Sequence, residues 1–290
     1  MAHRLSVLTL VRDRHAHLAG LLRGLECSRE LPFELIVIDM GSASPVVLPP
    51  LPFAASVRRL ESLSLPLAAA RNMAAAGAGG DVLLFLDVDC IPHPELLSHV
   101  KELLRNQDAI ICPEVRYMRK GETEQVFHAN LQHLPGLAHP ARSFPDEGVR
   151  REHNPGLFWS LAFGVRAGTF GRIGGFDESY VGYGAEDTDF GYRAARAKVP
   201  LLFTSGPPAF HQWHPSFDPP LQHFSDIVLN ARRFHRIWER WPMEGWLEAF
   251  AHMGLIEWSG DEPEIVRFPT PGEIEGARRV SGGEGTIASL

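Results

Sequence analysis

The chain has 290 residues, of which 44% are hydrophobic and 22% charged, with a formal net charge of −7. This length allows one large domain or two smaller ones with a sizeable core. The acidic balance argues against a dedicated nucleic-acid binder, because such proteins usually carry a basic stripe. We find no secretory signal and no apolar run near the roughly 20 residues that span a bilayer. We therefore expect a cytoplasmic protein without a transmembrane segment, and a peripheral membrane contact stays open.

The first 112 residues alternate between strand and helix patterns. Near-continuous apolar strands separated by helices predict a mostly parallel sheet with helices on both faces. Ligands of such sheets bind beyond the carboxyl ends of the strands, where Asp39, Asp87 and Asp89 fall. We predict strands over 5–11, 33–40 and 81–89, helices over 15–27, 67–78 and 94–106, and a Pro- and Ser-rich loop after residue 40.

The second half of the chain is less regular. Residues 113–157 are rich in His, Pro and Arg, so we expect a loop-rich insertion, and whether it forms a mobile lid is left open. After about residue 260, the Gly, Pro and Glu content predicts a loosely held tail. Between these segments we predict a strand and short helix over 156–170, a Gly-rich loop feeding a helix near Glu186, a short strand and His-rich turn over 201–215, and two amphipathic helices over 219–258.

Asp87 and Asp89 end the predicted strand 81–89 with one valine between them. Two such carboxylates repel each other unless a cation or hydrogen-bond donors compensate them. A hard divalent ion such as Mg²⁺ or Mn²⁺ prefers oxygen ligands and often keeps positions open for phosphate oxygens. The competing interpretation is a turn in which Asp89 caps the helix at 94, because D-x-D alone is a weak motif.

A second acidic cluster, Glu186, Asp187 and Asp189, lies in "YGAEDTDFGYR". The helix macrodipole favours acids in a first turn, so simple capping competes with a functional role. Three carboxylates in four residues exceed what capping needs, and one of them could serve as a general base. The glycines before them would let a ligand approach the backbone closely.

His211 and His214 follow in "FHQWH". Imidazole suits Mn²⁺ better than Mg²⁺, and a single histidine is enough to complete a carboxylate and phosphate shell. Either histidine could instead be a surface residue. Two supporting residues are Asp39, which could hydrogen-bond a base or ribose, and Arg71, which could face a diphosphate or simply solvent.

In combination, these segments resemble the GT-A glycosyltransferases of family 2, with a C-terminal half similar to the galactosyltransferase and chondroitin-polymerase branch. Two departures leave the transferred sugar unnamed. Met40 stands where the family usually has a second acid, and the "GWGGED" of galactosyltransferases is "GYGAED" here, with Tyr183 and Ala185 substituted. The motifs that carry the resemblance are "VLTLV", "VIDMGS", "ARN" at 70–72, "FLDVD" at 85–89, "GGFDESYVGYGAEDTDFGYR" and "FHQ", in family order over roughly residues 4–215.

The resemblance implies an α/β GT-A fold, which is Rossmann-like with a mostly parallel sheet, plus C-terminal amphipathic helices. It implies an inverting hexosyltransferase that uses a nucleotide-sugar, most simply a UDP-sugar, with Mn²⁺ or Mg²⁺ as cofactor. The acceptor, a saccharide, lipid or small molecule, stays unassigned. The implied parts are a nucleotide-sugar-binding half at 1–112, the insertion at 113–157, an acceptor and catalytic half at 158–215, C-terminal helices at 216–260 and a flexible tail at 261–290.

The resemblance also implies roles for individual residues. Asp187 would be the catalytic base and Glu186 would orient a sugar. Asp89 and His211 would hold the metal, with Asp87 and His214 in reserve. Trp159, Tyr183 and Trp213 are the candidate acceptor-binding side chains. The donor would contact Thr9, Val11, Arg12, Asp39, Arg71, Asp87, Val88 and Gly175.

Two other functions fit parts of the pattern. One is a catalytically silent protein of the same fold that binds a sugar-nucleotide without turnover. In such a protein the two acidic clusters would have no catalytic use, and each unpaired acid would lower its stability. A haloacid-dehalogenase-like phosphatase also places Asp-x-Asp after an apolar strand. That strand normally lies near the chain start and is joined by a later lysine, whereas 82 residues of strand and helix pattern precede this one and lysines are scarce.

Overall fold

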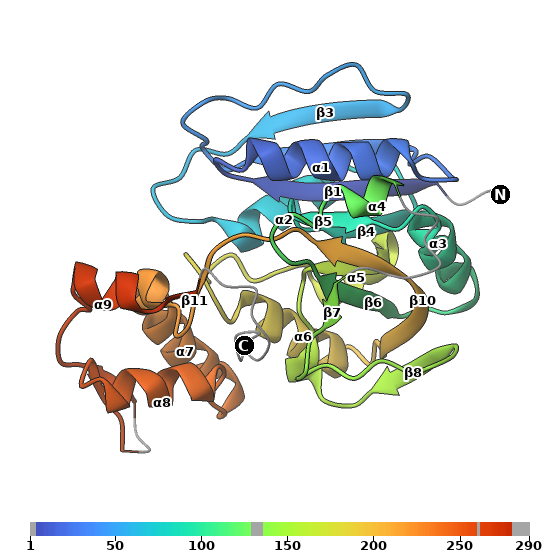
Figure 1. Cartoon of the computed structure of the whole chain (residues 1–290). Helices are drawn as coiled ribbons and strands as arrows, with labels where there is room; N and C mark the ends of the chain where they lie inside the picture. The colour runs from blue at the N-terminus through green and yellow to red at the C-terminus, as the bar shows by residue number, and fades with distance from the viewer. Residues whose placement is uncertain (1–3, 129–135, 260–261, 280–290) are drawn as a thin grey trace.

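The computed structural model describes residues 4–128, 136–259 and 262–279, and in these ranges a ten-stranded mixed sheet forms the centre of the protein (Figure 1). Its first half is parallel, in the order β3 (Ala54–Arg59), β2 (Glu34–Asp39), β1 (Leu5–Val11) and β4 (Val82–Leu86). The α/β fold with a largely parallel sheet is therefore confirmed. The other strands are β9 (Ala162–Arg166), antiparallel to β4 and β6, then β6 (Ile110–Tyr117), β10 (Leu201–His211), β5 (Cys90–Pro92), β7 (Leu137–Ala138) and β8 (Val149–Glu152).

Helices cover both faces of the sheet because its central strands are apolar on both sides. Every residue of β1 and β4 is buried. Helices α1 (His15–Glu26) and α3 (Leu96–Asn106) pack on one face, with Leu21 and Val100 fully buried there. Helices α2 (Leu67–Gly77), α5 (Ala167–Ile173) and α6 (Glu186–Arg196) pack on the other.

Three local expectations differ from the structure. The predicted strand 81–89 ends at Leu86, so Asp87–Asp89 form a turn instead. The Pro- and Ser-rich loop contains β3, an edge strand with five of its six residues exposed to solvent. The insertion 113–157 includes the end of β6, α4 (Gln125–His128), β7, β8 and η1 (Pro155–Leu157). Residues 129–135, on which a lid would partly depend, lie outside the described residues.

The C-terminal part forms a helical lobe beside the sheet (Figure 1). Its helices α7 (Phe224–Trp238) and α8 (Glu244–His252) follow η2 (Leu221–His223) and share a core around Phe224, Ile227 and Phe250. Two helices were predicted here. No helix among the described residues is long and apolar enough to cross a membrane.

The segment expected to be a loose tail is instead structured as far as residue 279. It forms β13 (Glu264–Ile265), α9 (Pro271–Gly276) and β14 (Arg278–Arg279). β13 pairs with β12 (Ile256–Glu257), and β14 pairs with β11 (Ser216–Phe217). A capping box between Thr270 and Glu273 starts α9, and Ala277 is buried in the lobe. The Gly, Pro and Glu content of the whole segment did not reveal the capping box or the short paired strands. Residues 280–290 lie outside the described part of the chain.

Candidate active site

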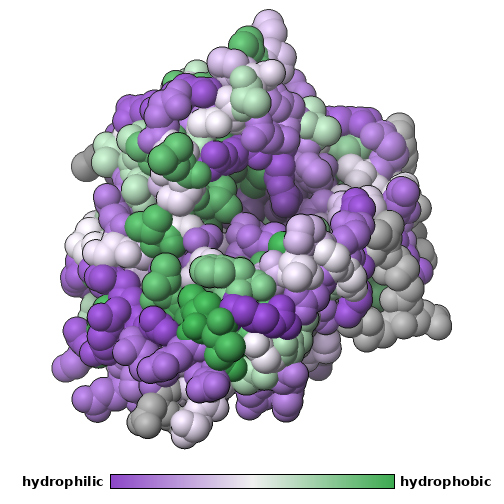
Figure 2. Space-filling view, turned by 90° about the vertical axis from the view of Figure 1, so that its left-hand side faces the viewer, coloured by the Kyte–Doolittle hydropathy of each residue, from purple (hydrophilic) through white to green (hydrophobic). Residues whose placement is uncertain are grey.

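A cavity of about 1310 Å³ lies between the sheet and the helical lobe. Figure 2, which views the molecule from the lobe side, shows a hollow with hydrophilic and apolar side chains at its rim. The walls come from segments far apart in the sequence. They include Arg12 and Arg14 after β1, Asp87–Asp89 after β4, residues 183–188 at the start of α6, His211 and His214 after β10, and His223, Trp241 and Trp246 of the lobe.

The Asp87–Asp89 turn is fixed by backbone hydrogen bonds on both sides. The Asp87 N–H donates to Leu161 O at 2.8 Å, and the Gln212 N–H donates to Asp89 O at 2.7 Å. The second bond holds the end of β10 beside Asp89. Burial raises the pKa of Asp87 to about 7, against the lowering effect of Arg71. The negative charge of Asp89 also contributes to raising the pKa of Asp87. The two carboxylates thus repel each other, as the sequence predicts.

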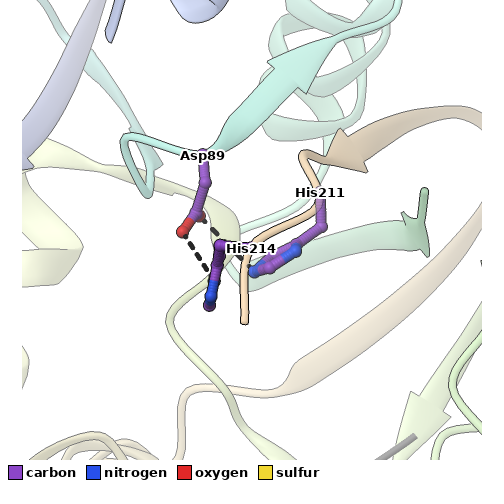
Figure 3. Close-up of side chains that lie close together, drawn as sticks. All are labelled: Asp89, His211 and His214. Carbon is purple, nitrogen blue, oxygen red and sulfur yellow. Dashed lines mark ion pairs between the residues drawn. The ribbon is translucent and has the colours of Figure 1, made fainter. Parts of the chain in front are cut away.

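Asp89, His211 and His214 form a group whose nitrogen and oxygen atoms lie within 4.8 Å of one another (Figure 3). His211 Nε2 is 3.6 Å from Asp89 Oδ1, and His214 Nε2 is 3.3 Å from Asp89 Oδ2. Burial lowers the pKa of His211 to about 4, which keeps its imidazole neutral, as a metal ligand must be. This donor set fits a divalent cation and suits Mn²⁺. Asp87, the reserve ligand, is not in the group.

The hydrogen bonding of His214 selects the nitrogen that can bind a cation. His214 Nδ1 lies 2.9 Å from Pro215 O, which can only accept. Nδ1 therefore donates to this carbonyl, and Nε2 is the nitrogen that faces Asp89. Burial alone would raise the pKa of Asp89, but His211, His214 and Arg14 outweigh it and lower that pKa.

Arg14 is a residue of the site that sequence reasoning missed. Its Nη1 lies 2.6 Å from Asp89 Oδ2, across 75 positions of sequence. Arg14 immediately precedes α1, where nothing in the local sequence identifies its distant partner. The structure thus places the guanidinium of Arg14 beside the Asp89 carboxylate of the D-x-D motif.

The second acidic cluster is divided between two environments. Glu186 Oε1 accepts from Arg71 Nη1 at 3.0 Å, and Arg71 Nη2 lies 3.7 Å from Asp87 Oδ1. Arg71 is only 4% exposed, so the solvent-facing alternative is wrong. Asp189 lies outside the cavity lining and accepts from Trp238 Nε1 at 2.8 Å. Only Glu186 and Asp187 of this cluster line the cavity.

Asp187 occupies the first turn of α6, where its Oδ1 accepts from the Thr188 N–H at 2.7 Å. Burial and the nearby Glu186 raise the pKa of Asp187 to about 7. A carboxylate with such a pKa is suited to general-base work near neutral pH.

Ala185 before the helix has φ +68°, a left-handed conformation that favours glycine.

The loop before α6 is held by α7. Asn230 Nδ2 lies 3.0 Å from Val181 O and 2.9 Å from Gly184 O, and Asp226 Oδ2 accepts from the Tyr183 N–H at 3.2 Å. We call this set of contacts the α7 clasp. Asn230 is buried among the apolar residues of α7. A polar residue at such a position in the sequence could have indicated a buried hydrogen bond of this kind.

The predicted donor-binding residues separate into two groups. Arg12 and Val88 line the cavity together with Arg71 and Asp87, whereas Thr9, Val11, Asp39 and Gly175 do not. Thr9 and Val11 are buried inside β1. Asp39 Oδ2 accepts from Arg59 Nη1 at 2.7 Å and Asp39 Oδ1 from the Ser42 N–H at 2.8 Å. Gly175 O accepts from Arg193 Nη1 at 2.9 Å. These four residues therefore do not face the cavity in this structure.

All three predicted acceptor side chains, Trp159, Tyr183 and Trp213, line the cavity. Tyr183 stacks on His223 with ring centroids 4.4 Å apart, so the lobe contributes to the same wall. Trp159 is only 8% exposed and offers a small part of its surface. The lobe residues Trp241 and Trp246 extend this aromatic wall.

Two family models match parts of the chain. Residues 6–170 match the model of glycosyl transferase family 2, and residues 153–211 match that of the N-terminal domain of galactosyltransferase. The chain is 31% identical over 150 residues to validoxylamine A glucosyltransferase of Streptomyces hygroscopicus subsp. jinggangensis (strain 5008), covering 50% of this chain and 30% of that protein. It is 28% identical over 242 residues to hyaluronan synthase of Pasteurella multocida, covering 73% and 25%. The chain thus spans less than a third of these relatives.

Solved structures show the same fold at low sequence identity. TarS 1-349 of S. aureus aligns with a TM-score of 0.56 and 16% identity, covering 80% of this chain and 65% of that one. The complex of the same protein with UDP-GlcNAc aligns with a TM-score of 0.51 and 15% identity, covering 80% and 66%. These likenesses show the fold.

Proposed function

The chain belongs to glycosyl transferase family 2, and we propose that it is a metal-dependent inverting transferase that moves a hexose-type sugar from a UDP-sugar to an acceptor hydroxyl. One observation carries the proposal: Asp187 and the Asp89, His211 and His214 group line the same cavity. A general base and a cation-binding group therefore face one space that is large enough for a donor and an acceptor. The UDP-sugar rests on the relatives, among them a glucosyltransferase and TarS, whose structures include complexes with UDP and UDP-GlcNAc.

The residues have separate tasks in this proposal. Asp89, His211 and His214 would hold Mn²⁺, which when bound supplies positive charge for the leaving diphosphate. Arg12, Arg71, Asp87 and Val88 form the donor side of the cavity, and Asp39, Thr9, Val11 and Gly175 support it from behind.

The chemical step belongs to Asp187. Its carboxylate takes the proton from the acceptor hydroxyl while the acceptor oxygen bonds to the anomeric carbon. The bond from that carbon to the diphosphate oxygen breaks in the same displacement, so the anomeric configuration inverts. Glu186, fixed by Arg71, orients a sugar beside the base. Tyr183, Trp159 and Trp213 offer aromatic surface to the acceptor.

The two rival functions have less support. A haloacid-dehalogenase-like phosphatase needs a lysine at its aspartate, and no lysine is among the described residues that line the cavity. A silent binding protein does not need a carboxylate whose pKa is raised to about 7 in the same cavity as the cation-binding group. The cytoplasmic location and the absence of a nucleic-acid partner stay predictions.

Calorimetric titration with UDP tests the proposal, with and without Mn²⁺, on wild type and Asp89→Ala. We expect UDP binding that requires both Mn²⁺ and Asp89, followed by transfer in a screen of UDP-sugars and acceptors. Silence of UDP, GDP and dTDP with every metal would reject the nucleotide site. Metal-dependent UDP binding without turnover on any acceptor would favour the silent binding protein.

A further inference from the structure

Arg14 holds the carboxylate at the centre of the cation-binding group. It reaches Asp89 from the loop between β1 and α1, with Nη1 2.6 Å from Oδ2. The side chain of Arg14 is 39% exposed and lines the cavity, whereas that of Asp89 is 9% exposed. A partly solvated arginine is thus the charge partner of a nearly buried acid.

Arg14 holds one of the two oxygens that Asp89 can offer to a cation. His214 Nε2 lies 3.3 Å from the same Oδ2, and Asp89 and His214 both belong to the group that fits a divalent ion. A guanidinium in contact with this oxygen would stand next to a doubly charged ion, and the two would repel strongly in a partly buried site. Arg14 and the ion therefore compete for Asp89.

We propose that Arg14 is an exchangeable counter-ion, which holds Asp89 until a divalent cation binds and then turns to the diphosphate of the donor. The proposal rests on the proposed function, since it concerns the same metal and donor. Among the described residues, Asp89 is the only partner that the structure gives the guanidinium, so one contact has to break. The released side chain stays in the cavity, where its planar donors match phosphate oxygens.

The exchange explains how Asp89 is stabilised in both states. Without a cation, Arg14 offsets the cost of a buried carboxylate beside Asp87. With a cation bound, Arg14 exchanges one anionic partner for another. A purely structural clamp would behave differently: removing it would loosen the Asp87–Asp89 turn and weaken cation binding.

The test is calorimetry on Arg14→Gln with two probes. The first probe is Mn²⁺ alone, which should bind the variant about tenfold more tightly, because a positive charge next to the ion has been removed. The second is UDP at saturating Mn²⁺, which should bind about tenfold more weakly, in the range of one lost charge-assisted contact. The two affinities are expected to change in opposite directions.

Two further variants make the result specific. Arg14→Lys keeps the charge and should leave the Mn²⁺ affinity near that of wild type. Arg23→Gln removes an exposed charge from α1 that pairs with Glu124, and it should change neither affinity. Equal or weaker Mn²⁺ binding by Arg14→Gln would overturn the exchange, as would Mn²⁺ binding that survives Asp89→Ala. Tighter Mn²⁺ binding with unchanged UDP binding would overturn the diphosphate contact.

The Mn²⁺ titration contains no donor, so it separates this inference from the proposed function. Tighter Mn²⁺ binding by Arg14→Gln in a protein that transfers no sugar would support the exchange and reject the transferase proposal. Sugar transfer by the wild type, combined with an Mn²⁺ affinity that is the same in Arg14→Gln, would support the transferase proposal and reject the exchange.

Discussion

Arg71 Nη1 donates to Glu186 Oε1 at 3.0 Å, and both side chains are almost fully buried. Arg71 comes from α2 and Glu186 from α6, 115 positions apart. The same guanidinium lies 3.7 Å from Asp87. One buried arginine therefore connects the two acidic clusters, which the sequence presents as separate motifs.

Replacing Arg71 should be costly because Glu186 would remain buried without a partner. Arg71→Met is expected to lower the free energy of unfolding by about 3–5 kcal/mol, measured by urea denaturation. The double variant Arg71→Met, Glu186→Met should regain part of the loss. Arg105→Met, which breaks an exposed pair with Glu102, is the matched control and should change stability by less than about 1 kcal/mol. An equal effect of the two single variants would contradict a structural role for Arg71.

Removing the proposed base should affect turnover and spare binding. Asp187→Asn is expected to reduce kcat by about 10²–10⁴-fold, the usual worth of a general base. UDP affinity at saturating Mn²⁺ should stay within twofold of wild type, roughly. Asp189→Asn, an acid two positions on that lies outside the cavity lining, serves as the control for kcat. Full activity of Asp187→Asn would remove this residue from the mechanism.

The pKa of Asp187 sets the pH dependence of the reaction. A base must be deprotonated to accept a proton, and burial raises the pKa of this carboxyl to about 7. The ratio kcat/KM should therefore rise with pH up to about 7 and level off above it. A profile measured over about pH 5.5 to 8.5 at fixed Mn²⁺ tests this. A rate that is already flat below pH 6, roughly, would mean that a group of lower pKa is the base.

The two histidines should each contribute to cation affinity. His211→Ala and His214→Ala are expected to weaken Mn²⁺ binding about tenfold or more, because each removes one imidazole from a three-residue group. His17, whose ring centroid lies 5.9 Å from that of His214, is outside the group. His17→Ala should therefore leave the affinity unchanged. If only one of the two histidine variants binds more weakly, the other histidine is not a ligand.

The α7 clasp predicts an effect on catalysis from outside the cavity. Asn230→Ala leaves the carbonyl groups of Val181 and Gly184 without this donor, which should cost about 1–3 kcal/mol of stability. It should also lower kcat while Mn²⁺ affinity is retained, because Asp187 follows the loop and the metal group does not. Leu229→Ala, an exposed neighbour on α7, controls for a change in the helix itself. An unchanged kcat would limit the clasp to stability.

The fold and much of the site could be predicted because the relevant residues follow buried strands or begin helices. Asp87, Asp89 and His211 all lie where apolar runs end, and the parallel part of the sheet brings such ends to one edge. Arg14 could not be predicted, because its partner is distant and its own loop carries no pattern. The edge strand β3 was missed for a different reason: five of its six residues are exposed, so its sequence, AASVRR, has no run of large apolar residues that would indicate a strand.

The α7 clasp binds main-chain atoms at residues 181, 183 and 184, and its contacts with this loop involve none of their side chains. These contacts hold the backbone at residue 183 through its N–H, whereas Gly182 has to remain glycine, because a Cβ there would collide with Asp226 of the clasp. We therefore expect that replacing Tyr183 with tryptophan would leave the backbone of the base that follows it in place. Such separation allows substrate choice to diverge between related enzymes by single replacements, while the reaction chemistry is inherited intact.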